Sequence, residues 1–250
     1  MANLLSSACF SSSLIFARKA GVSLFSDGMA KSFESSALSS LIPMTVDHIP
    51  PKNLFSNPRP QLITVPCCKI CNLSFSKDDE YLRLQLSLRH DVFPHSDVQK
   101  NWESINSGLQ RASWPGLKMH LLNNMMLVDV KTSAGIYIGK APCISVELGR
   151  LVKVVARIME GFYYKHKNKR LPDGIKPIAY SLNDMNDLDL EASTHLIKCI
   201  DFVKNSTITR IGDGVFSYYI RFLDDAPDYG MFLCTFYERV CFLGFYVNRN

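Results

Sequence analysis

The chain has no apolar run long enough to cross a bilayer, no glycine-rich phosphate-binding loop, no internal repeat and no Ser/His/Asp set. The best membrane candidate, residues 231–247, is interrupted by Glu238 and Arg239 and is better explained as two strands of a hairpin. These absences argue against nucleotide-loop enzymes, solenoids and triad hydrolases, and we expect no membrane partner.

Charge is present in only modest excess. Of 250 residues, 47% are hydrophobic and 20% charged, which is ordinary for a globular protein with one large or two small domains. The formal net charge of +5 is compatible with nucleic acid but does not require it. Four of the eight cysteines, Cys143, Cys199, Cys234 and Cys241, stand alone in apolar surroundings. Buried free thiols explain them best, which predicts a reducing, cytoplasmic location.

Residues 1–42 are rich in Ser and Ala and poor in acids, and they contain Arg18 and Lys19. They imitate a transit peptide or a secretory start only weakly, because no basic start is followed by a sustained apolar core. We expect a poorly ordered leader here.

The most informative stretch begins at Asp47-His48-Ile49-Pro50-Pro51 and continues to residues 62–72, LITVPCCKICN. It predicts a strand, a Pro-rich loop, a second strand, a Cys-x-x-Cys turn and a helix. Adjacent acid and imidazole groups at a strand end can hold a cation and take a proton from water, respectively. Asn72 offers a second oxygen ligand. Cys68 and Cys71 have the spacing of half a zinc site.

At these residues the chain resembles the HNH endonucleases, whose ββα-metal unit carries an Asp-His pair on its first strand and a Cys-x-x-Cys-Asn or -His turn before its helix. It is most similar to a group of mostly bacterial HNH-like proteins that share, in this order, the motifs found here at residues 47–52, 58–60, 62–66 and 76–81. The resemblance runs from Asp47 into residues 157–172, weakens beyond them and is absent before Pro43.

The resemblance implies hydrolysis of nucleic-acid phosphodiester bonds, with DNA as the expected partner. His48, Asp47 and Asn72 would be catalytic, and Asp47 and Asn72 would hold Mg²⁺ or Mn²⁺. Lys52 and Arg59 would contact flanking phosphates.

Two departures from the family pattern bear on activity. Family members usually carry an earlier Cys-x-x-Cys that completes a zinc tetrahedron, whereas only Cys9 lies upstream here. Structural zinc would then have two evident ligands, Cys68 and Cys71, or three if Cys67 also binds, where four are needed. Gln61 stands where the family often has Asn.

Other functions stay open at this point. The scaffold could be a non-catalytic remnant that binds nucleic acid or protein, the C-terminal sheet could be an interaction module, and the thiol pair could be a redox dithiol, although the βαβ setting is missing. The basic residues Lys165, Lys167 and Arg170 lie beside aromatics, a pattern that suits phosphate contact and stacking. A solvated helix end whose cations complement the helix dipole is the preferred explanation of these residues.

The expected fold class is α+β. We expect an HNH-like unit over residues 43–91, a helical region with a hairpin over 92–172, and an antiparallel sheet with one helix over 173–250. The spacing of apolar residues and the positions of turn residues predict strands at 45–49, 61–65, 177–182, 206–211, 215–223, 231–237 and 240–247, and a hairpin at 126–132/135–139. The same signals predict a helix capped by Ser76 and running through the alternating leucines 82–88, and further helices at 98–109, from Pro115, at 148–162 and at 192–203.

Overall fold

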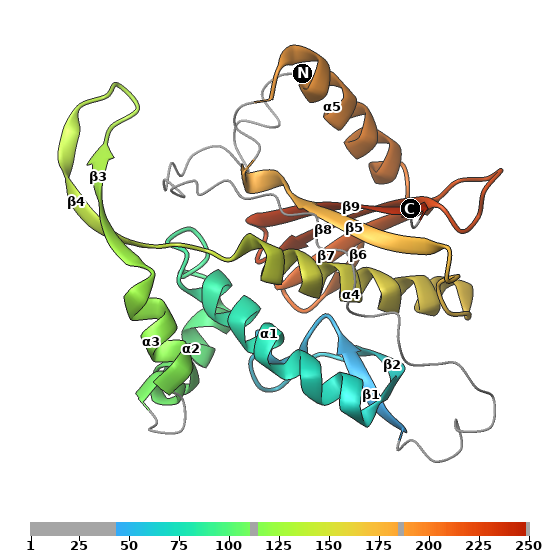
Figure 1. Cartoon of the computed structure of the whole chain (residues 1–250), viewed down its shortest axis with the longest axis horizontal. Helices are drawn as coiled ribbons and strands as arrows, with labels where there is room; N and C mark the ends of the chain where they lie inside the picture. Colours follow the sequence, from blue (N-terminus) through green and yellow to red (C-terminus); the bar gives the residue numbers. More distant parts are fainter. Residues whose placement is uncertain (1–43, 111–114, 185–187, 249–250) are drawn as a thin grey trace.

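The computed structural model of the chain describes residues 44–110, 115–184 and 188–248 (Figure 1); the expected leader lies outside these ranges. Strands β1 (Met44–Ile49) and β2 (Ile63–Cys68) pair antiparallel, and helix α1 (Lys69–Ser87) follows directly. A short 3-10 turn, Lys52–Leu54, lies in the Pro-rich connection. We call β1, β2 and α1 the hairpin–helix unit.

The prediction that Ser76 caps α1 is wrong. The helix begins two turns earlier, because the Cys68 sulfur accepts the Cys71 N–H at 3.1 Å and serves as the N-cap. Leu82, Leu84 and Leu86 are helical, as predicted, and are buried on two sides, whereas Leu88 is the C-cap residue and is partly buried. Leu82 and Leu86 join the main core, whereas Leu84 faces a second cluster formed by α2 and α3.

Helices α2 (Ser96–Gln110) and α3 (Pro115–Asn123) follow, then the ribbon of β3 (Met125–Lys131) and β4 (Tyr137–Ile144). All four were predicted from periodicity and turn residues, but β4 starts two residues later and ends five residues later than the predicted 135–139. In Figure 1 the ribbon stands away from the rest of the chain, to the left of the C-terminal sheet.

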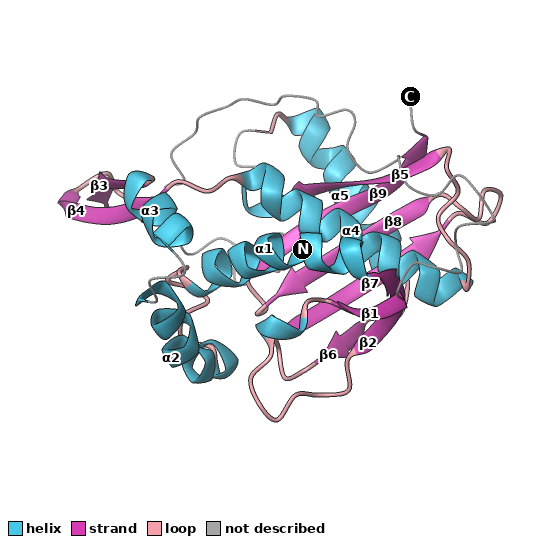
Figure 2. Ribbon diagram, turned by 60° about the horizontal axis from the view of Figure 1, so that its bottom comes forward, coloured by secondary structure: helices cyan, strands magenta, loops and turns pink. Residues whose placement is uncertain are grey.

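Helix α4 (Leu148–Lys167) is the central element. Of the five apolar residues whose spacing predicted it, Leu151, Val155, Ile158 and Phe162 are buried, whereas Leu148, at its first residue, is exposed. It packs between the hairpin–helix unit and the C-terminal sheet (Figures 1 and 2). Its Gly161 lies so close to β1 that an added Cβ would come within 2.7 Å of the Ile49 side chain.

The C-terminal sheet has the order β5-β9-β8-β7-β6 with antiparallel pairing throughout. Its strands are β5 (Ile175–Ser181), β6 (Thr209–Ile211), β7 (Phe216–Phe222), β8 (Gly230–Phe236) and β9 (Val240–Asn248). A 3-10 turn (Leu182–Asp184) and helix α5 (Leu190–Lys204) separate β5 from β6.

The two faces of this sheet are covered by different helices. Phe232 and Phe236 of β8 pack toward α4 in the main core, whereas Leu233 points to the opposite face, where it packs with Val203 of α5. This is the alternation expected of a strand buried on both sides. Strand β6 starts three residues later than predicted, because Asn205 and Ser206 donate their N–H groups to carbonyls in the last turn of α5.

One buried cluster joins the hairpin–helix unit, α4 and the C-terminal sheet, with members from Ile49 to Tyr246. The predicted α+β class with a C-terminal antiparallel sheet is confirmed. Among the described residues, no helix is both long enough and apolar enough to span a bilayer.

Candidate functional site

The register of the β1–β2 hairpin decides which way each candidate side chain points. Asp47 lies opposite Val65 and His48 lies opposite Thr64. Residues directly opposite share a face, and successive residues alternate between faces. Asp47 therefore faces inward with Ile49, both buried, whereas His48 lies on the outward face with exposed Thr64 and is half-buried.

Asp47 is held by a partner that sequence reasoning did not identify. Its Oδ2 accepts a hydrogen bond from Arg157 Nη1 of α4 at 2.9 Å, and both residues are only 7% exposed. The other guanidinium nitrogen, Nη2, donates to Asp79 of α1. Two carboxylates thus share one cation, and we call Asp47, Arg157 and Asp79 the buried triad.

The buried triad carries a net charge of −1 when both acids are ionised. Burial raises the pKa of Asp79 to about 6, and Arg157 opposes that rise. The only sequence signal for the triad is the position of Arg157 between Val155 and Ile158 on the apolar stripe of α4.

His48 sits at the end of β1 beside two exposed cations. Partial burial and the positive charges of Lys52 and Arg59 lower its pKa below 6.5, although Asp47 acts in the opposite direction. The imidazole is therefore mostly neutral at pH 7, the state a general base requires. Both cations lie in the connection between β1 and β2.

Asn72 ties the first turn of α1 to β1. Its Nδ2 donates to the Val46 carbonyl at 3.1 Å. This bond turns the amide oxygen away from that carbonyl and sets the approach of α1 to the strand. The β1–β2 hairpin also has a shallow open depression of about 410 Å³, lined by residues of both strands: Thr45, Val46, Thr64, Val65 and Pro66.

The cysteines of the turn are free thiols. A hydrogen bond between the Cys68 and Cys71 side chains lowers the pKa of Cys68 and raises that of Cys71 to about 11. Cys67 donates to the Cys68 carbonyl at 3.4 Å, and burial and nearby Asp47 raise its pKa. Within residues 44–110, 115–184 and 188–248, no three His, Cys, Asp or Glu side chains are grouped to hold a metal ion.

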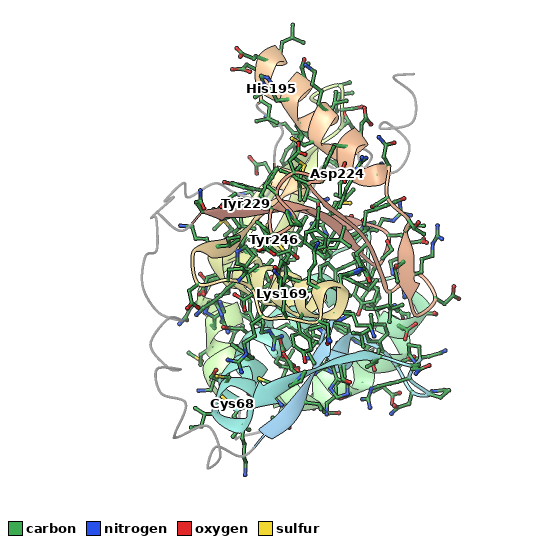
Figure 3. The ribbon with its side chains drawn as sticks, turned by 90° about the vertical axis from the view of Figure 1, so that its right-hand side faces the viewer. Cys68, Lys169, His195, Asp224, Tyr229 and Tyr246 are labelled. Atoms are coloured by element: carbon green, nitrogen blue, oxygen red, sulfur yellow. The ribbon has the colours of Figure 1, made fainter. Side chains whose placement is uncertain are left out.

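The basic end of α4 is partly engaged in contacts within the chain. Lys167 Nζ lies 4.1 Å from the centre of the Phe222 ring, and Lys169 forms a 2.7 Å ion pair with Asp228. Lys165 and Arg170 are exposed. In Figure 3, Lys169 lies between Cys68, at the end of the molecule formed by the hairpin–helix unit, and the α5 helix labelled by His195.

Comparisons with protein-family models, with curated proteins and with solved structures found no match to this chain. The functional assignment therefore depends on the residues and geometry described above.

Proposed function

We propose that the hairpin–helix unit hydrolyses phosphodiester bonds in nucleic acid, with DNA as its main substrate, as an HNH-type endonuclease that uses a divalent cation. The observation that carries the proposal is His48: a strand-end imidazole with a lowered pKa, half-buried on the outward face between two exposed cations. The free thiols in the described chain also agree with a reducing, cytoplasmic setting.

Asp47 and Asn72 fit a hard divalent cation by donor type. Protein Mg²⁺ sites often use one or two carboxylates, and water and substrate phosphate complete the coordination. Asn72 Nδ2 donates to the Val46 carbonyl, so the amide oxygen of Asn72 is the atom that would bind the cation. Asp47 Oδ2 already accepts a hydrogen bond from Arg157. Bound Mg²⁺ or Mn²⁺ would neutralise charge that develops on the scissile phosphate.

Structural zinc does not fit the described residues. Cys68 and Cys71 supply two thiols, whereas a closed site needs four ligands, and the third thiol, Cys67, bonds to a backbone carbonyl. The Cys68 cap and the Asn72 tie hold the turn by hydrogen bonds instead.

In the proposed reaction, neutral His48 takes a proton from the attacking water. Lys52 and Arg59 contact the phosphates on either side of the scissile bond and keep the imidazole deprotonated through their charge. Asp47 is kept in place from the opposite face of β1 by Arg157, so the strand end that carries His48 is anchored to the core.

Plasmid nicking with added Mg²⁺ or Mn²⁺ tests the proposal. His48→Ala should reduce nicking by at least about 100-fold, as expected for loss of a general base, with DNA affinity nearly unchanged. Thr64→Ala removes the cross-strand neighbour on the same face and is the matched control, which should nick like the wild type. A chelator should stop cleavage, and the rate should fall only below pH 6.5, where His48 becomes protonated. Equal nicking by the wild type and His48→Ala would rule out the assignment.

A second function, a non-catalytic scaffold that binds nucleic acid, is favoured by the Arg157 bond to Asp47, since one oxygen of that carboxylate is already bonded to a guanidinium within the chain. Titration with Mn²⁺ separates the two proposals. The nuclease should bind the ion and lose that binding in Asp47→Asn, whereas the scaffold should bind DNA without binding the ion.

A further inference from the structure

The β3–β4 ribbon is a sheet of only two strands, and no other strand of the described chain pairs with it. Figures 1 and 2 show it standing clear of the C-terminal sheet and of α4. An isolated two-stranded ribbon is marginally stable in water. A partner that extends or covers the ribbon would remove this weakness.

The ribbon exposes large apolar side chains along its length and around its turn. Leu127 is 68% exposed and Ile138 is 65% exposed. The set comprises Met125, Met126, Leu127, Ile136, Tyr137 and Ile138. Because successive strand residues point to opposite faces, these side chains form apolar patches on both faces of the ribbon.

Among the residues that the structure describes, none pairs with the outer edge of β3. Ser145 N–H donates to the Asn124 carbonyl at 2.9 Å at one end of the ladder, and Thr132 N–H donates to the Ile136 carbonyl at 2.8 Å at the other. Because the bonding direction alternates along an antiparallel strand, Leu127, Asp129 and Lys131 turn their backbone groups to the outer edge of β3.

The outer edge of β4 is a poorer template. Pro142 lies opposite Leu127, so it belongs to a pair whose backbone groups face outward, and proline offers no N–H there. Edge strands without proline or other protection are the ones that pair with another chain. The available edge is therefore β3.

We propose that β3 pairs antiparallel with β3 of a second copy of this chain, centred on Val130, to form a continuous four-stranded sheet. The charge pattern selects this register. Pairing centred on Asp129 would set the two carboxylates opposite each other, and pairing centred on Val128 would set each Asp129 opposite Leu127, without an opposite charge across the strands. Pairing centred on Val130 sets Asp129 opposite Lys131 of the second copy, twice by symmetry, and opposite charges across strands stabilise a sheet.

A dimer formed by pairing of the two β3 edges does not use the hairpin–helix unit. Ile136, Tyr137 and Ile138 lie in the turn and in β4, so they stay outside this edge contact.

The test is the oligomeric state of the full chain, measured by sedimentation velocity between about 1 and 100 µM. The wild type should be a dimer. Asp129→Lys and Lys131→Asp should each raise the dimer dissociation constant by at least about tenfold, because each places like charges opposite. The two variants mixed should form a heterodimer, since each lysine at the interface then faces an aspartate of the other copy. Lys198→Asp on exposed α5 makes the same charge change as Lys131→Asp and should leave the dimer intact.

Circular dichroism on each variant confirms that the fold is retained. A wild type that stays monomeric at the highest concentration, or a dimer indifferent to both ribbon variants, would overturn the proposal. Two weakened variants that fail to pair when mixed would reject the register and with it the proposed interface. A monomer that co-sediments with phosphatidylcholine vesicles would assign the patch to a lipid surface instead.

Discussion

Asp79→Asn should stabilise the protein at neutral pH, although it removes one carboxylate from a guanidinium. The wild-type triad holds two carboxylates around a single Arg157 in a largely buried site, so one negative charge is uncompensated. In the variant the remaining Asp47–Arg157 pair is neutral overall, and the oxygen of the introduced amide can still accept a hydrogen bond from Arg157 Nη2.

The magnitude follows from the pKa of Asp79, which rises from 3.8 to about 6. A pKa difference of about 2 corresponds to about 3 kcal/mol between the two protonation states. The folded state holds the proton more tightly than the unfolded chain, so stability falls as pH rises from about 4 to about 6 and the full penalty applies above that window. The substitution should therefore add up to about 3 kcal/mol at pH 7 and little at pH 4.

Urea denaturation at several pH values between about 4 and 8 measures this effect as the extrapolated free energy of unfolding. Asp78→Asn is the matched control: Asp78 pairs with Arg150 at 2.8 Å in a partly exposed position, where a pair contributes about 0–1 kcal/mol. The reasoning fails if Asp79→Asn is the less stable protein at pH 7, or if it keeps the wild-type slope between pH 4 and 6.

Three further changes probe neighbouring features. Arg157→Gln should cost about 3–5 kcal/mol at pH 7, because it leaves two buried carboxylates without their cation; a urea midpoint close to the wild type would contradict this. Gly161→Ala should cost about 1–3 kcal/mol of stability, since the new Cβ would lie 2.7 Å from the Ile49 side chain at the end of β1. Gly108→Ala is the control: its new Cβ would have no heavy atom within 4 Å, so thermal melts should show it to be neutral or stabilising. Under native conditions iodoacetamide should label Cys68 first and the fully buried Cys234 last. The reason is that hydrogen bonds with Cys71 lower the pKa of Cys68, whereas burial raises the pKa of Cys234. Mass spectrometry of the digested protein measures the order of labelling.

Most helices and strands could be predicted because their signals are local. The stripe of α4, the turn residues between β3 and β4, and the alternation in β7 to β9 depend on residues close in sequence. The start of α1 could not be placed this way. Cysteine is not among the preferred N-cap residues, whereas Ser76 and the acids after it imitate a standard helix start.

The candidate site was only partly accessible from sequence, for a different reason. Strand alternation already requires Asp47 and His48 to point to opposite faces. The partner of Asp47 is Arg157, 110 positions later, and no local pattern encodes an ion pair over that separation. The same limit applies to the β3–β4 ribbon: alternation predicted a hairpin, but the exposure of its apolar side chains depends on what else packs nearby.

The contacts of β1 indicate that the hairpin–helix unit does not set its own geometry. Asp47 is bonded to α4 through Arg157, and Ile49 fits against α4 only because residue 161 lacks a side chain. His48 lies between these two anchors, so its position depends on α4, which packs in turn against the C-terminal sheet. A general base loses efficiency when its position shifts by even about 1 Å. On the proposed nuclease function, substitutions at the interface of α4 with β1 should therefore reduce nicking even where the fold survives, whereas changes on α5, across the sheet, should not.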